Sequence, residues 1–511
     1  MIFDKVIKYF HYSVLLFLST IFLLSPAHSN EITDNVMNLS LEEGKLMVLQ
    51  NNLDIAIQQI TPLIETEMIT AEKGAFDSVL SGSFRREDSS TPLSTRSSVA
   101  AGGRASVESE VYSLSTGLSG KSPLGTEYSL EFENVWTENT FNSFNAEYDS
   151  FAGIRIIQPL LKDSGSSVNN FNIVIARKNH DQSISDLKLN TINTLSSYKM
   201  AYWNLVLSLE ELKVKEEALK LAQSLLNLNR KRLKAEVTSP LEVTQAEAGV
   251  ASRKEDLIIA GNEVRARENA LKKLITNDIY SLRNIRIIPA NRPVISEALF
   301  DLDNNFKQGI ENRPDYTKVK TEIDKKEIIV QYEKNQKYPD VDLEASYGFN
   351  GLGNSFSNSL NDMGNNDEWS LGVVVKIPLG NREAKGKLTI AQLEARQGLL
   401  ILKKLEQEIL IEIDNAIRSA ETNMQRIKAA RVSKRLAEES LQAEEIKLKE
   451  GLSTSHDVLE FQEDLIEARS REIIAVIDYN KSLVELARVK GTLLQEEGIS
   501  ISDNSVTMVR R

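Results

Sequence analysis

Twelve residues, Arg232-Leu233-Lys234-Ala235-Glu236-Val237-Thr238-Ser239-Pro240-Leu241-Glu242-Val243, have a counterpart 215 positions later in Lys447-Leu448-Lys449-Glu450-Gly451-Leu452-Ser453-Thr454-Ser455-His456-Asp457-Val458. Each copy leaves a long heptad-patterned segment, passes through a turn and enters a second helical segment. The same offset relates Ile258-Ile259-Ala260 to Ile473-Ile474-Ala475. A duplicated unit of this size predicts two structurally similar halves.

Both copies end a long stretch without proline, which allows long helices to run. No proline lies between Pro159 and Pro240 or after Pro378. Leucine recurs every seven residues from Leu205 to Leu233, and apolar residues alternate spacings of three and four from Leu402 to Ile427. This pattern predicts coiled-coil packing. We expect helices over 160–238, 240–276, 382–450 and 454–494, and a helix of about 65 residues would be roughly 100 Å long.

Segments of alternating apolar and polar residues precede each long helix. They lie near 340–350 and 368–378 in the second half, and near 76–86 and 150–159 in the first. Runs of about ten residues with one apolar face are typical of transmembrane β-strands, although a soluble sheet has the same period. The first half also has an added hairpin at about 106–136. It either joins the barrel wall or packs elsewhere, and both interpretations stay open.

The N-terminus has the layout of a secretory signal peptide, which we assign to residues 1–29. Lys5 and Lys8 precede an apolar run from Val14 to Leu24, and Ala27-His28-Ser29 has the small-x-small form of a cleavage site. The apolar run is too short to span a membrane as a helix, which makes an uncleaved anchor the less favoured interpretation. The signal favours the membrane-barrel interpretation of the strands.

Composition excludes several classes of function. The net charge of −12 without a basic cluster argues against a nucleic-acid partner. The chain has no cysteine and only four histidines, so it offers little material for a metal site, and we expect no cofactor. No nucleophile–base pair or phosphate-binding glycine loop is evident, so we expect no enzyme.

These features predict a mixed fold class, with long coiled-coil-like helical hairpins, β-strands and an internal duplication. We expect a first repeat over 38–276, a connecting segment over 277–312, a second repeat over 313–494 and a mobile tail over 495–511. Four to six strands cannot close a membrane barrel alone, because open sheet edges are not tolerated in lipid. We therefore expect a homotrimer that shares one barrel in outer membrane lipid, with its helices forming a hollow tube.

In order and spacing, five segments resemble the TolC family of outer membrane efflux proteins over about 38–494. The segments are Leu39-Ser40-Leu41-Glu42-Glu43, Gln158-Pro159-Leu160-Leu161, Asn312-Arg313-Pro314-Asp315, Gly451-Leu452-Ser453 and Asp457-Val458-Leu459. The resemblance implies a homotrimeric channel-tunnel in the outer membrane of a Gram-negative cell, with a periplasmic helical extension. It also implies two partners, a periplasmic adaptor and an inner-membrane transporter.

The turns between the paired helices contain the candidate site residues. Ser239-Pro240-Leu241-Glu242 has the pattern of a capping box with proline at the first helical position, and Thr454 to Asp457 has the same spacing. The plainer interpretation is therefore that Glu242 and Asp457 stabilise helix N-termini. A functional interpretation is that Asp457 and Glu460 point into the tube as two carboxylate rings, a cation-selective constriction. The resemblance places acidic rings at these positions.

The resemblance also assigns a docking role to Gly451, Leu452 and Ser453, which match the tip that contacts the adaptor. The alternative is a glycine helix stop followed by a small apolar residue. Glu236-Val237-Thr238 lacks the glycine and is the weaker candidate. The aromatic and arginine latch of the family is missing, because Leu448 and Ser453 occupy those positions.

The predicted function is a passive outer membrane conduit for efflux or type I secretion, opened by its partners. The alternative is a periplasmic coiled-coil scaffold that does not conduct. The alternating strands discriminate between them, because a scaffold needs no apolar belt that faces lipid.

Overall fold

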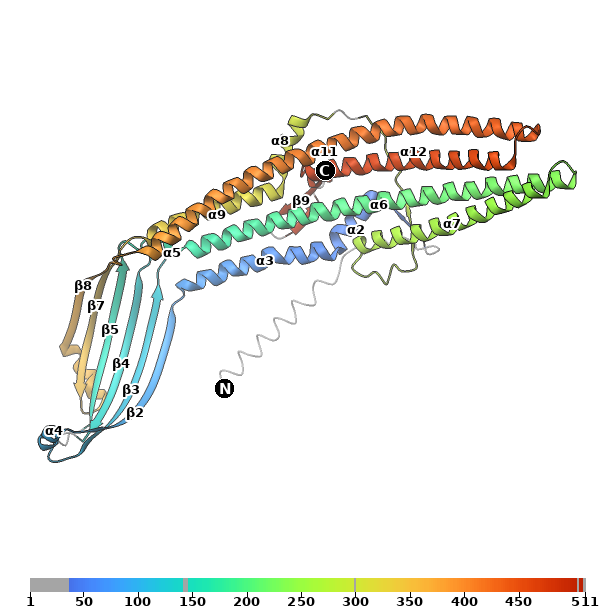
Figure 1. The fold of residues 1–511 in the computed structure, drawn as a ribbon. Coiled ribbons are helices and arrows are strands. Elements are labelled where there is room, and N and C mark those ends of the chain that lie inside the picture. The colour runs from blue at the N-terminus through green and yellow to red at the C-terminus, as the bar shows by residue number, and fades with distance from the viewer. Residues whose placement is uncertain (1–35, 141–145, 298–299, 503–504, 509–511) are drawn as a thin grey trace.

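The computed structural model describes residues 36–140, 146–297, 300–502 and 505–508. The predicted signal peptide at 1–29 lies outside these residues. The described chain is elongated, with a sheet at one end and two helical tips at the other (Figure 1). Among the described residues, every helix is either too short or too polar to span a lipid bilayer.

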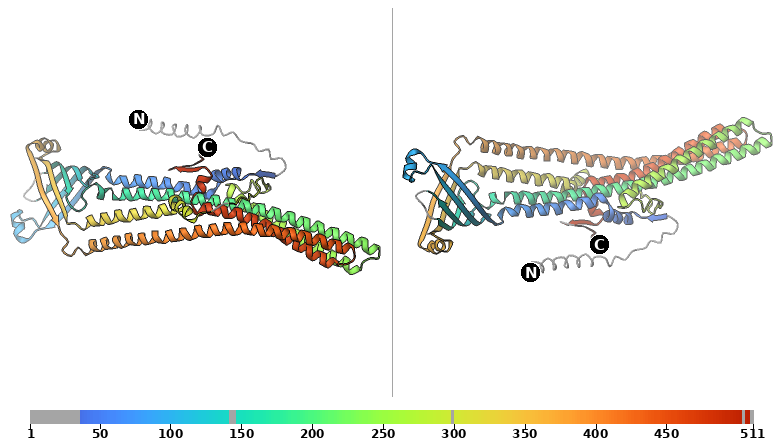
Figure 2. Two further views of the ribbon diagram at one scale, coloured as in Figure 1. Left: turned by 90° about the horizontal axis from the view of Figure 1, so that it is seen from above. Right: turned by 90° about the horizontal axis from the view of Figure 1, so that it is seen from below.

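The two halves repeat the same order of helices, which confirms the duplication. The first half contains α2 (Leu41–Asn51), α3 (Leu53–Lys73), α6 (Phe171–Lys234) and α7 (Pro240–Ile275). The second half contains α8 (Leu302–Asn312), α9 (Pro314–Gln336), α11 (Arg382–Lys449) and α12 (Ser455–Val489). Near the sheet, α3 packs on α6, α6 on α9 and α9 on α11, so these four helices form one layer (Figure 2).

The first long helix begins at Phe171 rather than at residue 160. The intervening residues form a turn with Asp163 at a φ of 59° and a short helix, α5 (Ser166–Asn169). The Asn169 side-chain amide donates to the carbonyl oxygens of Asp163 and Gly165 at 2.8 and 2.9 Å. These local bonds compete with a helical backbone, so the helix starts only after them.

Six antiparallel strands form one continuous sheet in the order β2-β3-β4-β5-β7-β8. Their bounds are β2 (Val79–Pro92), β3 (Ser106–Lys121), β4 (Glu127–Asn139), β5 (Glu147–Pro159), β7 (Asp340–Gly353) and β8 (Asn366–Lys376). The added hairpin is therefore β3–β4, and it lies inside the sheet, between β2 and β5. The two halves meet where β5 pairs with β7.

The two faces of the sheet differ in polarity. One row of paired residues is apolar across all six strands, and it consists of Leu80, Leu118, Leu130, Ile154, Tyr347 and Trp369. The neighbouring row, on the opposite face, contains Ser119, Ser129, Arg155, Ser346 and Ser370. Since successive side chains of a strand point to opposite faces, one face is an apolar belt and the other is polar.

The largest core lies midway along the helices. There Tyr198, Tyr202 and Leu205 of α6 are fully buried against α2, α7 and α12. The Tyr202 hydroxyl donates to the carbonyl oxygen of Leu39 at 3.1 Å. Leu39 ends β1 (Val36–Leu39), which pairs in parallel with β6 (Arg286–Pro289) of the connecting segment. This contact joins the start of the first half to the segment between the halves.

The described part of the segment after Gln495 packs on this core, in contrast to the predicted mobile tail over 495–511. After the short helix α13 (Leu493–Glu496), β9 (Ile499–Ser502) pairs with β10 (Ser505–Met508), and Ile499 is buried in the core. The Glu497 carboxylate accepts hydrogen bonds from the ammonium groups of Lys45, at 3.0 Å, and Lys199. Sequence periodicity did not reveal this packing, because it depends on partners roughly 300 and 450 residues away.

Acid should loosen this attachment. Burial opposes ionisation of Glu497, but Lys199 and Lys45 outweigh it and hold its pKa below the ordinary value of 4.5. A depressed carboxyl pKa contributes stability that is present above pH 4.5 and is lost as the pH falls through the folded-state pKa. We expect the melting temperature of the wild type to fall more steeply below pH 4.5 than that of Glu497→Gln. Parallel curves for the two proteins would exclude this role.

Candidate functional site at the helical tips

The two helical tips share one backbone conformation. After α11, Gly451 has a φ of 78°, and the Leu452 N–H donates to the carbonyl oxygen of Lys447 at 2.9 Å. After α6, Glu236 has a φ of 59°, and the Val237 N–H donates to the carbonyl oxygen of Arg232 at 2.9 Å. Helices commonly end in this way, with a residue in the left-handed conformation that lets the following N–H groups donate to the last carbonyl oxygens of the helix. The lack of glycine at residue 236 therefore does not change the turn, although a non-glycine residue adopts this conformation at a cost.

Both tips end in an exposed apolar side chain at equivalent positions. The side chains of Leu452 and Val237 are 79% and 65% exposed. In contrast, Ser453 is half-buried, and its hydroxyl lies 3.4 Å from the carboxylate of Asp457. The structure thus places two largely exposed apolar side chains, one per hairpin, at the helical tips, which lie at the end farthest from the sheet (Figure 1).

At the second tip, the predicted cap is present. The Asp457 N–H donates to the Thr454 hydroxyl at 3.3 Å, and the Thr454 N–H donates to Oδ2 of Asp457 at 3.1 Å. The Thr454 hydroxyl also donates to this oxygen, at 2.8 Å. These bonds from the side chain and backbone of Thr454 lower the pKa of Asp457. The capping box therefore stabilises the ionised form of this carboxylate.

At the first tip, the predicted capping box does not form. Ser239 precedes α7 without a side-chain cap bond, and Pro240 at the first helical position has no N–H to satisfy. Instead, Oε2 of Glu242 accepts from the backbone N–H of Ser455 at 2.8 Å. Glu242 therefore caps the N-terminus of α12, in the other hairpin, and not the N-terminus of its own helix. Sequence spacing suggested only a local partner, Ser239. Packing of the two hairpins instead brings the backbone N–H of Ser455 to the Glu242 carboxylate.

Three side chains of the first hairpin bind the ends of the second, and we call this set the tip clasp: Asn229, Arg232 and Glu242. Asn229 is 1% exposed, and its amide donates to the Ser455 hydroxyl at 2.7 Å and to the carbonyl oxygen of Glu242 at 3.1 Å. Arg232 donates to the carbonyl oxygen of Leu448 at 2.8 Å. The cation thus lies at the C-terminus of α11 and the anion at the N-terminus of α12, as the helix dipoles favour.

One polar residue in the heptad pattern of the sequence points to the clasp. Asn229 lies four residues after the buried Leu225, so it occupies a core position of the coiled coil. A polar residue at such a position commonly specifies the register of the helices. Its counterpart 215 residues later is Glu444, which is also buried and pairs with Lys447 at 2.8 Å.

The two proposed constriction residues lie in different environments. Asp457 is half-buried within its cap. Glu460, one turn later on α12, is exposed and forms no hydrogen bond or ion pair with the described residues. Residue spacing places both on adjacent turns of one helix face.

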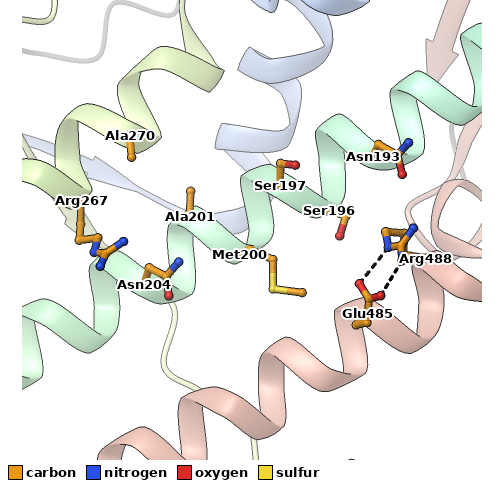
Figure 3. Close-up of a pocket in the computed structure, with 10 residues that line it drawn as sticks. All are labelled: Asn193, Ser196, Ser197, Met200, Ala201, Asn204, Arg267, Ala270, Glu485 and Arg488. Atoms are coloured by element: carbon orange, nitrogen blue, oxygen red, sulfur yellow. Dashed lines mark hydrogen bonds and ion pairs between the residues drawn. The ribbon is translucent and has the colours of Figure 1, made fainter. Parts of the chain in front are cut away.

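A hollow of 520 Å³ lies between α6, α7 and α12, midway along the helices (Figure 3). Asn193, Ser196 and Asn204 of α6 line it, and the Glu485 carboxylate is held by Arg488 at 2.6 Å. These groups can hydrogen bond with water or a polar solute. Within the described residues, no group of acidic or histidine side chains is placed to hold a metal ion.

Comparison with known proteins identifies the class. The family model described as outer membrane efflux protein matches residues 122–277 and 306–492, one match in each half. No curated protein sequence matches the chain.

Solved structures with this fold include the Campylobacter jejuni CmeC outer membrane channel, at 15% identity and a TM-score of 0.65, with 89% of each chain covered. The Vibrio cholerae outer membrane protein VceC has 17% identity and a TM-score of 0.64, with 88% of this chain and 96% of that chain covered. The open state of the Neisseria gonorrhoeae MtrE outer membrane channel has 17% identity and a TM-score of 0.59, with 89% of each chain covered.

The chain belongs to the outer membrane efflux protein family. It is an efflux protein of the outer membrane, as the resemblance predicted, and its fold of long helices and an antiparallel sheet with internal duplication matches the solved outer membrane channels.

Proposed function

We propose that three copies of this chain form a passive conduit from the periplasm to the exterior, which a periplasmic adaptor and an inner-membrane transporter engage and open. The observation that carries this proposal is that the molecule has two free edges along its length. Among the described residues, β2 and β8 are the two end strands of the sheet, and α3 and α11 are the two end helices of the layer beside it. One edge is therefore formed by β2 and α3, and the other by β8 and α11. A structure with two such complementary edges closes only by adding copies of itself.

The helical edges expose apolar stripes that fit this assembly. On α3 the exposed side chains recur at spacings of three and four residues, namely Leu53, Ile57, Ile60, Ile64 and Met68. On α11 they include Ile390, Leu393, Leu400, Ile401 and Ile411. Stripes of this size mark protein interfaces. In a ring, α3 of one copy would cover α11 of the next.

The sheet supports a membrane location over a scaffold. Its apolar row crosses every strand, and the aromatic side chains of Trp369, Tyr347 and Phe84 are on the same face. Lipid provides a partner for such a face, whereas a scaffold in water would leave it exposed. The alternative of a non-conducting scaffold gives no account of this belt.

At the other end, we propose that Asp457 and Glu460 form the cation-selective constriction. Six carboxylates, two from each of three chains, would then converge at the narrow end. The low pKa of Asp457 supports this role, because the group stays charged. The unpaired Glu460 supports it further, since no described residue neutralises it.

The test is ionic current across a planar bilayer. We expect the purified trimer to conduct with cation selectivity, and Glu460→Gln to lower the ratio of potassium to chloride permeability several-fold. The double variant Asp457→Asn/Glu460→Gln should lower it further. Glu460→Gln leaves the Thr454 cap intact, so it separates the pore role from helix stability. A trimer without current would refute the conduit, and unchanged selectivity would remove these residues from the constriction.

We propose that Gly451, Leu452 and Ser453, with Val237 at the equivalent position, dock the adaptor. Because the chain has no cysteine, Leu452→Cys provides a unique attachment point for a photo-crosslinker. We expect it to capture the periplasmic adaptor in cells, identified by mass spectrometry. Leu379→Cys is the control, because Leu379 is even more exposed than Leu452, at 99% against 79%, but follows β8 at the sheet end of the molecule. Equal capture from both positions, or none from residue 452, would contradict the docking role.

A further inference from the structure

The β3–β4 hairpin is hydrogen-bonded into the sheet on both sides. β3 pairs with β2 from Val79↔Ser119 to Pro92↔Ser106, along the whole of β2. β4 pairs with β5 from Glu127↔Ile157 to Thr137↔Glu147. Without the hairpin, β2 has no partner among the described residues of the chain. Each chain therefore presents six strands as one unit.

The turn of this hairpin is anchored on the helical layer. The Gly165 N–H donates to the carbonyl oxygen of Leu124 at 3.1 Å, and the Thr126 hydroxyl donates to the Gln158 side chain at 2.5 Å. Gly125 has a φ of 94°, and a Cβ there would come within 2.6 Å of the Asp163 carbonyl oxygen. The close approach requires glycine. The turn between β3 and β4 therefore packs against the residues just before α6, which include Asp163 and Gly165.

The free edges of the sheet match in direction. β2 runs away from the helices and β8 runs back toward them, so β8 of one copy can pair with β2 of the next in the antiparallel sense (Figure 1). Every residue of β2 is exposed, and β8 is exposed at all but Val374. Since unpaired strand edges are not tolerated in lipid, this edge pairing is the one that the proposed membrane location requires.

Building on the proposed function, we propose that three chains close an eighteen-stranded sheet, and that the β3–β4 hairpin determines the size of the cargo that the outer end admits. Barrel diameter grows roughly linearly with strand number. Eighteen strands would therefore give a lumen about 1.5 times as wide as the twelve strands that remain without the hairpin. The conduit is thus built for bulky hydrated solutes.

The side chains on the polar face leave this lumen open. From β2 and β3 they are mostly small, namely Ser81, Ser83, Ser113, Ser115, Gly117 and Ser119. Ser83 and Ser115 bond to each other through their hydroxyls at 2.8 Å, along the wall. β4 adds Glu131 and Glu133 to the same face. Hydroxyl and carboxylate groups favour a wall in contact with water.

The loop between β7 and β8 leaves the polar face uncovered. Its short helix α10 (Phe356–Asp362) packs on the opposite face, where the Ser359 and Ser150 hydroxyls bond at 2.8 Å. Asn134 donates to Ser150 at 2.7 Å, and all three side chains are buried. Ser150 and Asn134 belong to the face of the apolar row. α10 is therefore held outside the proposed lumen.

Deletion of residues 106–139 tests the hairpin directly. It leaves β2 and β5 antiparallel, joined through the remaining residues of the two distal loops, so a twelve-stranded trimer can still close. Ser83→Cys is made in the full chain and in the deletion, and both are treated from outside with maleimide-polyethylene glycols of graded mass. We expect the full chain to react with reagents that the deletion excludes. Phe84→Cys, on the apolar face, is the matched control and should react with none.

Imaging of the full-length trimer by electron cryomicroscopy covers the case in which the deletion does not fold. Eighteen strands around the lumen are expected. A conducting assembly with twelve strands, or the same size limit with and without the hairpin, would overturn this inference and leave the conduit intact. A trimer of eighteen strands that carries no current would refute the conduit and leave the strand count standing.

Discussion

Replacing Leu118 by arginine should keep the chain from assembling in the outer membrane, whereas arginine at the adjacent Ser119 should be tolerated. Leu118 lies in the apolar row between Leu80 and Leu130, on the strand β3, which is paired on both sides. An arginine that faces lipid near the bilayer midplane costs about 2–4 kcal/mol. Three copies would therefore lose roughly 6–12 kcal/mol, which is comparable to the whole stability of a folded domain.

Ser119 is the matched control, because it is one residue away on the same strand and points to the polar face. Its paired neighbours are Val79 and Ser129, and a lumen would hydrate the new charge. The readouts are outer membrane fractionation and heat-modifiable migration of the trimer. We expect Leu118→Arg to lose both and Ser119→Arg to retain both. The opposite pattern would show that the apolar face is the inner one, and equal behaviour would show that the sheet does not lie in lipid.

Breaking the tip clasp should free the two hairpins from each other. Asn229→Ala leaves the buried Ser455 hydroxyl without its donor, and Glu242→Ala removes the acceptor of the Ser455 N–H. An unsatisfied buried group costs about 1–3 kcal/mol and a lost helix cap about 0.5–2 kcal/mol. We expect the double variant to lose about 2–4 kcal/mol of coupling between the hairpins.

Amide hydrogen exchange measures this loss at the bond itself. Since each 1.4 kcal/mol is tenfold, exchange at Ser455 should accelerate by roughly 30- to 1000-fold. Glu247→Ala is the control. It removes the exposed ion pair with Arg230 on the same hairpin, which is worth about 0–1 kcal/mol. If both variants change exchange at Ser455 equally, the clasp does not hold the two hairpins together at their tips.

In planar bilayers, we expect the double variant Asn229→Ala/Glu242→Ala to show a larger current than Glu247→Ala.

Local patterns in the sequence predicted much of the fold. Apolar residues at alternating spacings of three and four identified α11 as helical over 382–450, and the structure has it over Arg382–Lys449. Strict alternation predicted β7 and β8 within three residues at each end. The capping box at Thr454 was also predicted correctly, because its partners are three residues apart. In each case, the decisive interactions are close in sequence.

The errors and open points arose where a distant segment competes with a local one. Glu242 has a local partner in sequence, but Ser455 approaches it in space. The position of the β3–β4 hairpin in the sheet depends on hydrogen bonds to β2 and β5. The alternation of apolar and polar residues along a strand does not specify these partners. The left-handed Glu236 was not anticipated either, because the fold imposes on it a turn for which glycine is the usual signal.

The amino-acid sequence by itself determined that this protein is a duplicated unit of strands and long paired helices, since periodicity and proline placement act over a few residues. Only the tertiary structure decided that six strands form one sheet, that Ile499 and Ile501 after Gln495 pack on the core, and that one hairpin caps the other. The physical reason is that edge pairing, buried charge and cross-hairpin capping depend on which groups meet after folding. Contacts of this kind, between residues far apart in the sequence, produce no periodic pattern of apolar residues.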